Sequence, residues 1–474
     1  MLAEDIERLY SVEWKELSEK YCDKQPWPTR EAISSQCIGD DGRPDDFFLR
    51  LYEEMALRHL FAKLKPTLQD RIDAWRVYLD LFAQFEKCQE LSIALSPQWV
   101  FDILHEFVYQ FQSFCQFRTQ NAGRTPQDRA LLQQNQSVWS ANVVLEHLRI
   151  LTDVSKIATA VKAPSETHAQ FGYFAIVTQS RLECLLGDYE SAVELLMVPC
   201  VKPFDEASLC SKVFACRITC LYHLGFALLM LKRYRESISV FNSMLAYLAR
   251  LQKSGGFARF SAADQVQKNH DRMLALLAVA VALAPGAAVV DDVVVQNLKD
   301  KYGDKMALCA RGDVPAFHAL LTFACPKFVV PAVPDYDSNV DSTNDAYRLQ
   351  VDLFIAQVAH QQRLAKIRSY LKLYTSIGID KLARFNDVSP QEFRTHLVGI
   401  KQKLRAQSGG EALAPFYAPV SANGDGAGDL HFYVAGDMLH VDEPPCEVRH
   451  DDFFAGQMQK YDGVIATLHQ QRKK

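Results

Sequence analysis

Apolar residues recur at helical spacing through most of the chain, and helix-start signals precede several of these runs. Thr67 and Asp70 form a capping-box pattern before one such run. Ser96 followed by Pro97 places an N-cap residue before a proline at the first helical position. The helix predicted there carries an apolar stripe formed by Trp99, Ile103, Phe107, Phe111 and Phe114. We interpret this stripe as core-facing, with a ligand groove as the alternative.

A local repeat follows in the middle of the chain. Residues 186–193 (LGDYESAV) are echoed by residues 231–238 (LKRYRESI) at an offset of 45. Tyr222, Gly225 and Ala227 add the large-small-small pattern of the first helix of a tetratricopeptide-type pair. A helix–turn–helix unit cannot bury its apolar face alone. We therefore expect neighbouring pairs to stack into a tetratricopeptide/HEAT-like right-handed helical solenoid.

From about residue 350 the pattern becomes that of a smaller, mixed unit. We expect one or two helices over residues 353–374 and a short helix over residues 379–385. Ser389 and Pro390 open a further helix. Its predicted buried face is lined by Phe393, Leu397, Ile400 and Leu404.

The strand signals of the chain follow this helix. Residues 408–428 are rich in Gly, Ala and Pro and predict a flexible loop. Residues 430–434 then alternate between apolar and polar or aromatic side chains, and a turn at residues 435–437 leads into a second strand over residues 438–441. No other segment predicts a convincing strand. The order of helices and hairpin is that of a winged helix.

The last apolar pattern is a seam near the end of the chain. Its residues recur at alternating spacings of four and three, and they are Phe454, Met458, Tyr461, Ile465 and Leu468. Two heptads are too few for a stable coiled coil, so this helix needs other helices to cover its seam. We predict a C-terminal assembly helix that packs in a partner helix bundle, with packing onto its own domain as the alternative.

Composition and length indicate a globular protein with more than one domain. The chain has 474 residues, 49% hydrophobic and 23% charged, which predicts two to four domains. Its 12 cysteines are dispersed, and no histidine spacing completes a zinc site near Cys216 and Cys220. We interpret the cysteines as buried apolar side chains and predict no metal. Because the N-terminal residues lack a secretory-signal pattern, we expect a cytoplasmic protein.

One uncharged run, residues 273–290, is long enough to suggest a membrane span. Pro285 interrupts it, and the helical part that is left has the length of a buried core helix. We therefore predict a core helix and no membrane contact.

Basic residues concentrate in one part of the chain. The formal net charge is −5, but residues 363–405 contain ten Lys or Arg against three acidic residues, a formal charge of +7. Winged helices offer such surfaces to phosphate backbones. The residues predicted to contact RNA or an acidic partner are Lys366, Arg368, Lys372, Lys401, Lys403 and Arg405. A solvated helix surface is the alternative, because phosphate binding requires the charges to share one face.

The sequence contains no motif for enzyme chemistry. It has no G-x-x-x-x-G-K-[ST] phosphate loop, no H-E-x-x-H metal pair and no G-x-S-x-G nucleophile elbow. The glycine-rich residues 424–428 lack a preceding strand and a following helix, so we expect no nucleotide binding. We predict neither catalytic residues nor a cofactor. An active site assembled from dispersed Ser, His and Asp is the alternative.

Helical repeats, a winged helix and a terminal helix, in this order, resemble the PCI-domain family. Several segments resemble more specifically the family of subunit L of eukaryotic translation initiation factor three. They are residues 106–118 (EFVYQFQSFCQFR), 301–306 (KYGDKM), 325–328 (CPKF), 334–337 (PDYD), 367–375, 381–383 and 391–394. The resemblance extends over residues 43–470. The loop at residues 408–428 is richer in Gly and Ala than in the family, and the first 40 residues match poorly.

The resemblance implies a non-catalytic structural subunit of the initiation factor three complex. The implied domains are a solenoid over residues 43–350, a PCI-type winged helix over residues 351–445 and the assembly helix over residues 446–474, with residues 1–42 unassigned. The implied partners are subunits K and E, the PCI/MPN core and the small ribosomal subunit, in support of preinitiation complex assembly. The alternatives are a PCI scaffold subunit of the proteasome lid or COP9 signalosome, and an independent winged-helix nucleic-acid-binding protein.

Overall fold

The protein, described by a computed structural model, is mostly helical and divides into two compact units. The first unit runs to Gln362 and the second begins at Arg363. Each unit has its own hydrophobic core. The structure describes residues 7–34, 36, 45–87, 94–120, 123–157, 163–254, 263–285, 287–336, 342–371, 373–408 and 431–442, together with Met458 and Tyr461.

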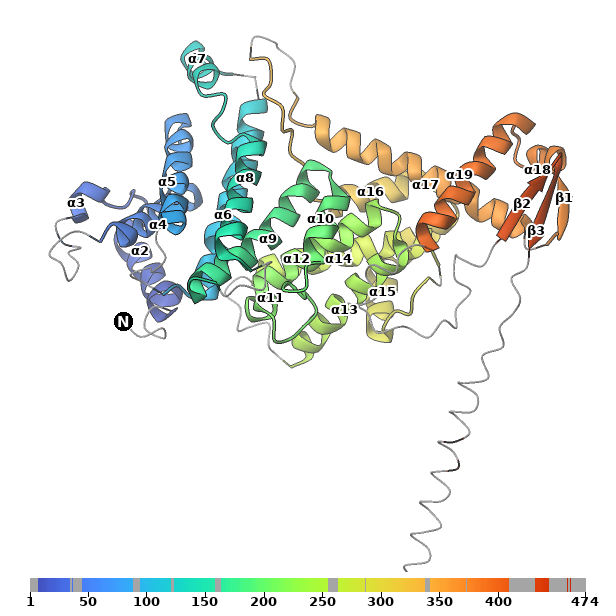
Figure 1. The fold of residues 1–474 in the computed structure, drawn as a ribbon, viewed down its shortest axis with the longest axis horizontal. Coiled ribbons are helices and arrows are strands. Elements are labelled where there is room, and N and C mark those ends of the chain that lie inside the picture. The colour runs from blue at the N-terminus through green and yellow to red at the C-terminus, as the bar shows by residue number, and fades with distance from the viewer. Residues whose placement is uncertain are drawn as a thin grey trace, which may run out of the picture. The chain divides into compact units, whose positions relative to one another are not determined.

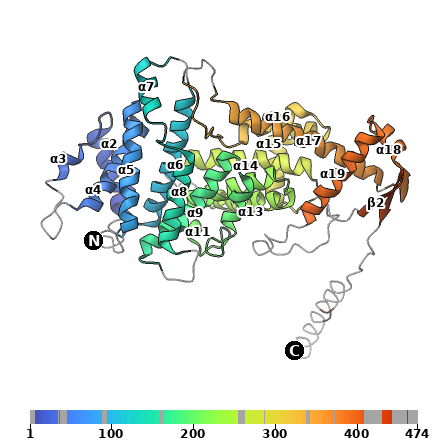
Figure 2. The same cartoon turned by 45° about the horizontal axis from the view of Figure 1, so that its top comes forward.

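The first unit is a stack of helices that contact one another largely in chain order (Figures 1 and 2). Its elements are the π-helix η1 (Leu9–Glu13), α2 (Trp14–Cys22), α3 (Arg30–Ser34), α4 (Asp46–Lys63), α5 (Leu68–Lys87), α6 (Pro97–Thr119), α7 (Pro126–Gln134), α8 (Ala141–Ser155), α9 (Glu166–Leu186), α10 (Tyr189–Leu196), α11 (Leu209–Lys212), α12 (Phe214–Met230), α13 (Tyr234–Lys253), α14 (Ala263–Leu283), α15 (Asp292–Ala310), α16 (Val314–Ala324) and most of α17 (Asp345–Leu371). Direct contacts join α8 to α9, α9 to α10, α10 to α12, α12 to α13 and α13 to α14. The buried side chains form one continuous core, as expected where neighbouring repeats cover one another's apolar faces.

The predicted helix starts are confirmed by their capping hydrogen bonds. At the start of α5, the Thr67 amide donates to the Asp70 carboxylate at 2.8 Å, and the Asp70 amide donates to the Thr67 hydroxyl at 3.2 Å. This reciprocal pair is a capping box. The Ser96 hydroxyl accepts from the amide of Trp99 at the start of α6. The predicted aromatic stripe of α6 is buried, so its interpretation as a core face is confirmed.

The predicted repeat forms two helix pairs, α9 with α10 and α12 with α13. Both tyrosines aligned by the repeat, Tyr189 and Tyr234, begin the second helix of their pair. Gly187 ends α9 with a φ of +93°, a left-handed conformation that glycine adopts at low cost. Gly225 lies under the ring of Phe241, where the two helices of the second pair approach closely.

The uncharged run at residues 273–290 contributes to the core, as predicted. α14 ends two residues before Pro285, and the stretch from Met273 to Ala280 is buried. Among the helices that the structure describes, none is both long and apolar enough to cross a membrane.

An extended segment, residues 325–336, follows α16 and is hereafter called the strap. Gln112 and Arg118 of α6 donate hydrogen bonds to strap carbonyl oxygens at 2.6 and 2.8 Å. The amide of Val329 donates to the carbonyl oxygen of Leu185 in α9 at 3.1 Å. The middle of α6 and the strap carry much of the family resemblance, and they contact each other directly.

Residues 7–34, which the sequence pattern leaves unassigned, fold against α4 and α6. The Tyr10 ring stacks on Trp99 with 4.7 Å between ring centroids. The Trp27 ring lies 5.8 Å from the ring of His59 in α4. The elements η1, α2 and α3 contain no buried residue. This segment is therefore held by polar contacts and by the partly buried rings of Tyr10, Trp14 and Trp27, which pack against the core.

The second unit is a winged helix. It combines the end of α17 with β1 (Ser376–Gly378), α18 (Ile379–Phe385), α19 (Pro390–Ser408), β2 (His431–Ala435) and β3 (Met438–Asp442). The three strands form an antiparallel sheet in the order β1-β3-β2. Helix, strand, two helices and hairpin is the winged-helix order, so the predicted fold class, a helical solenoid followed by a winged helix, is confirmed.

The core of the winged helix follows the predicted pattern on α19. Phe393, Leu397 and Ile400 are buried together with Leu439 of β3. The Ser389 hydroxyl caps α19 by accepting from the Glu392 amide, as predicted. The side chain of Leu404 lies outside the described residues, as does the predicted flexible loop beyond Ser408.

Two sequence-based predictions for this region were incomplete. The expectation that the hairpin contains the only strands was wrong, because β1 pairs with β3 through Ile377 and Leu439. With three residues, β1 is too short to show the alternation that reveals a strand. The segment expected to form one or two helices is a single helix, α17, which starts earlier than predicted.

Candidate functional site

The basic residues predicted to contact RNA or an acidic partner belong to α17 and α19 in the second unit. Lys366 and Lys401 are exposed. The structure describes only the helical backbone of Arg368, Lys403 and Arg405, and Lys372 lies outside the described residues. A shared basic face on these two helices therefore stays a prediction.

The predicted assembly seam is described at two of its five positions. Met458 and Tyr461 are in helical conformation, with 63% and 66% of their surface exposed. Phe454, Ile465 and Leu468 lie outside the described residues. The role of this seam in a helix bundle stays a prediction.

An aromatic–lysine cluster lies on the winged helix, within the basic segment of residues 363–405. It consists of Tyr370, Tyr374, Lys381 and Phe385. The Lys381 ammonium lies 5.7 Å from the Tyr374 ring centroid and 5.9 Å from that of Phe385. The Tyr370 and Phe385 rings lie 5.5 Å apart. Lys381 is one of the ten basic residues of the segment 363–405. The rings around it could not be predicted from the sequence pattern, because they come from the end of α17, the following linker and α18.

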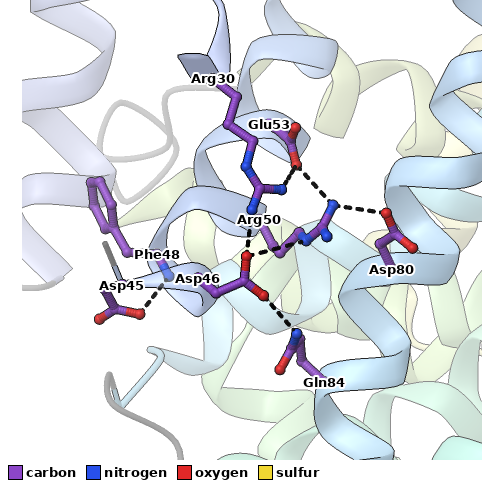
Figure 3. Close-up of polar contacts among 8 residues, drawn as sticks. All are labelled: Arg30, Asp45, Asp46, Phe48, Arg50, Glu53, Asp80 and Gln84. Carbon is purple, nitrogen blue, oxygen red and sulfur yellow. Dashed lines mark hydrogen bonds and ion pairs between the residues drawn. The ribbon is translucent and has the colours of Figure 1, made fainter. Parts of the chain in front are cut away.

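A charge network joins α3, α4 and α5 in the first unit (Figure 3). Asp46 contacts the guanidinium groups of Arg30 and Arg50. Glu53 bridges the same two arginines at 3.1 and 3.4 Å, and Arg50 also reaches Asp80 of α5 at 2.7 Å. Each exposed pair of this kind contributes about 0–1 kcal/mol. The network positions α3 against α4 and α5. Its arginines and carboxylates pair with one another, so we interpret it as structural.

A more deeply buried polar network anchors η1. The Arg58 guanidinium donates to Glu54 and to the Tyr10 hydroxyl, each at 2.6 Å, and the Tyr10 hydroxyl donates to Asp102 at 2.5 Å. The Tyr78 hydroxyl donates to Glu54 at 3.1 Å. Burial raises the pKa of Glu54, although Arg58 opposes this shift. A carboxyl group with a raised pKa is a frequent acid–base catalyst. Because its hydrogen bonds here run to other side chains of the chain, we interpret the network as an anchor.

Three cysteines, Cys210 of α11 and Cys216 and Cys220 of α12, lie where these two helices meet. The sulfur atoms of Cys210 and Cys216 are 3.7 Å apart, and Cys220 follows one helical turn later. All three are buried, as predicted for cysteines that act as small apolar side chains. Over the described part of the chain, no group of three or more His, Cys, Asp or Glu side chains is placed to hold a metal ion.

Comparison with known proteins gives a consistent result over almost the whole chain. A family model described as RNA polymerase I-associated factor PAF67 matches residues 70–461. Eukaryotic translation initiation factor 3 subunit L of Xenopus laevis is 34% identical over 488 aligned residues, which cover 98% of this chain and 84% of the relative. The Homo sapiens protein of the same name is 33% identical, over 97% of this chain and 82% of the relative. For Nematostella vectensis the identity is 32%, over 98% and 89%.

The alignments therefore include the parts that define the fold: the helix stack, the strap and the winged helix. A match of this length and identity establishes common descent and a common fold for the whole chain, beyond any single motif. The chain belongs to the family of eukaryotic translation initiation factor 3 subunit L.

Proposed function

We propose that this chain is a non-catalytic structural subunit of the eukaryotic translation initiation factor 3 complex in the cytoplasm. In this role it supports assembly of the preinitiation complex on the small ribosomal subunit through protein–protein contacts. The observation that carries the proposal is the similarity to subunit L proteins over 98% of the chain. The helix stack agrees with it, since stacked helical repeats present long surfaces for protein partners.

The proposal gives each part of the chain a task. The solenoid over residues 43–350 and the winged helix over residues 351–445 contact neighbouring subunits, among them subunits K and E and the PCI/MPN core. The helix over residues 446–474 provides the principal assembly element. Met458 and Tyr461 support this assignment, because large apolar side chains with about two thirds of their surface exposed favour burial against a partner.

The test replaces two apolar residues of the seam by charges. We expect Ile465→Asp combined with Leu468→Asp to abolish binding to subunits K and E. Two carboxylates in a dry helix bundle cost several kcal/mol, which lowers affinity about a thousandfold. The measurement is co-purification of the full chain with these two subunits, accompanied by a thermal melt of the isolated variant.

A matched control carries the same charges away from the seam, as Gln459→Asp combined with Gln470→Asp. We expect this control to bind like the wild type. If the seam variant retains its partners, the assembly role of the helix is wrong. A melt that collapses in the seam variant alone would instead identify the helix as part of its own domain's core.

A further inference from the structure

The aromatic–lysine cluster combines exposed rings with positive charge. Tyr374 and Phe385 have 37% and 38% of their surface exposed, so part of each ring faces solvent. Lys381 lies within 6 Å of both ring centroids, the range of a cation–π contact. Leu373, beside the cluster, is 75% exposed and extends its apolar surface.

Two cationic side chains of α18 accompany these rings. Lys381 and Arg384 of α18 are exposed, and neither forms an ion pair with any residue that the structure describes. By contrast, Arg394 of α19 is already engaged by Asp437. The surrounding residues 363–405 have a formal charge of +7 in a chain of −5. An anionic ligand is therefore attracted to this part of the molecule.

We propose that the aromatic–lysine cluster binds unpaired RNA. Nucleobases stack on the exposed parts of Tyr374 and Phe385, while Lys381 and Arg384 contact the neighbouring phosphates. Stacking on aromatic side chains combined with phosphate contacts is how proteins hold single strands. A duplex keeps its bases stacked inside the helix, so it can use the two cations but not the two rings.

The proposal rests on the proposed function in one respect, because the small ribosomal subunit and its messenger are the expected source of unpaired RNA. It assigns this task to residues outside the predicted protein-binding seam and outside the predicted basic contacts on α17 and α19. RNA binding and subunit assembly are therefore measured separately.

The experiment uses the full chain and two fluorescent probes, a short single-stranded oligouridylate and a blunt-ended RNA duplex with the same number of phosphates. Anisotropy titrations are made at low and at moderate salt. We expect Tyr374→Leu combined with Phe385→Leu, which keeps apolar side chains but removes both rings, to bind the single strand at least about tenfold more weakly. Binding of the duplex should change little. Lys381→Gln should lower the affinity for both probes and reduce the salt dependence of binding.

The matched control is Tyr433→Leu, which removes an exposed ring from the sheet of the same unit and should leave single-strand binding unchanged. If the thermal melt shows that Phe385→Leu disturbs the fold, Tyr374→Leu alone decides the test. The proposal is overturned if the wild type does not prefer the single strand, or if the leucine variant binds it like the wild type. An acidic peptide that binds the wild type more tightly than the single strand does, displaces it, and is not bound by the leucine variant would identify a protein-docking surface and also overturn the proposal.

Co-purification with subunits K and E separates this proposal from the proposed function. The leucine variant should assemble normally. If the leucine variant assembles normally and binds RNA like the wild type, only the proposed RNA site is contradicted. If the wild-type chain binds RNA but neither subunit, only the structural role is contradicted.

Discussion

Gly225 shows how a single residue permits the close packing of the helix repeat. A β-carbon at this position would lie 2.5 Å from a ring carbon of Phe241. The Phe241 side chain is fully buried, so its ring has little room to move. The small residue predicted from the repeat pattern is therefore required by the packing between α12 and α13.

The first prediction concerns this contact. We expect Gly225→Ala to lower the free energy of unfolding by about 1–2 kcal/mol, because overpacking outweighs the better helix propensity of alanine. Gly303→Ala in α15 is the matched control, since a β-carbon added there would meet nothing within 4 Å. That control should be more stable by up to about 1 kcal/mol. Urea denaturation measures both, and a stabilised Gly225→Ala variant would contradict the packing argument.

Two largely buried histidines make the stability of the first unit depend on pH. Burial, together with the charge of Arg181, lowers the pKa of His223 to about 3. Burial also holds the pKa of His105 well below its ordinary value, and Arg181 donates to the His105 ring at 2.9 Å. Both imidazoles are therefore neutral in the folded protein and take up protons only on unfolding.

The second prediction follows from the sign of this shift. Below the ordinary pKa of 6.5, the unfolded chain binds more protons than the folded chain, so stability falls as the pH falls. For His223 alone the loss between pH 7 and pH 5 is about 2 kcal/mol. We expect His223→Gln to show a shallower pH dependence of the urea midpoint than the wild type. The control, His318→Gln at an exposed position, should show the same pH dependence of the urea midpoint as the wild type. The same pH dependence in all three proteins would contradict a role for His223.

At the scale of elements, the strap depends on α6 for its position. Arg118 is buried and donates to the carbonyl oxygens of Pro331 and Val330 at 2.8 and 3.4 Å. These carbonyl groups belong to an extended segment that forms no sheet, so their hydrogen bonds come from side chains or water. The strap thus links α16 to helices that precede it by about two hundred residues.

The third prediction is that Arg118→Leu releases the strap. Loss of charged hydrogen bonds to these partly buried carbonyl groups should cost about 2–3 kcal/mol. Amide hydrogen exchange should accelerate over residues 325–336 in particular. Arg76→Leu, which removes an exposed arginine paired with Asp73, should change stability by less than about 1 kcal/mol. Exchange that accelerates evenly along the chain, or nowhere, would contradict a local role for Arg118.

At the scale of the whole molecule, charge is distributed unevenly. Residues 363–405 are strongly basic and the remainder of the chain is acidic. Exposed Lys366 and Lys401 belong to this basic segment. A local excess of positive charge attracts polyanions over distances set by the salt concentration, so the segment is expected to guide the chain toward ribosomal RNA or an acidic partner.

The fourth prediction tests this charge. We expect reversal of Lys401, Lys403 and Arg405 to Glu to weaken association with small ribosomal subunits and to reduce its salt dependence. The control reverses three exposed lysines of the first unit, Lys253, Lys268 and Lys299, and makes the same change in net charge. Sedimentation with small subunits at low and moderate salt measures both. Equal behaviour of the two variants would show that the basic segment is only a solvated surface.

Much of the fold is determined by short-range signals in the sequence. The capping box at Thr67, the Ser–Pro start of α6 and the repeat around Tyr189 and Tyr234 all form the predicted structures. These signals are readable because a helix cap or an apolar periodicity involves residues only a few positions apart. The hairpin and the buried face of α19 are predictable for the same reason.

Only the tertiary structure decided the features that join distant parts of the chain. The docking of Tyr10 on Trp99, the strap beside α6 and the pairing of β1 with β3 each depend on a partner far away in sequence. The aromatic–lysine cluster likewise forms because α17, its linker and α18 meet in the winged helix. No local periodicity encodes such meetings, since they depend on how whole elements pack to bury their apolar faces.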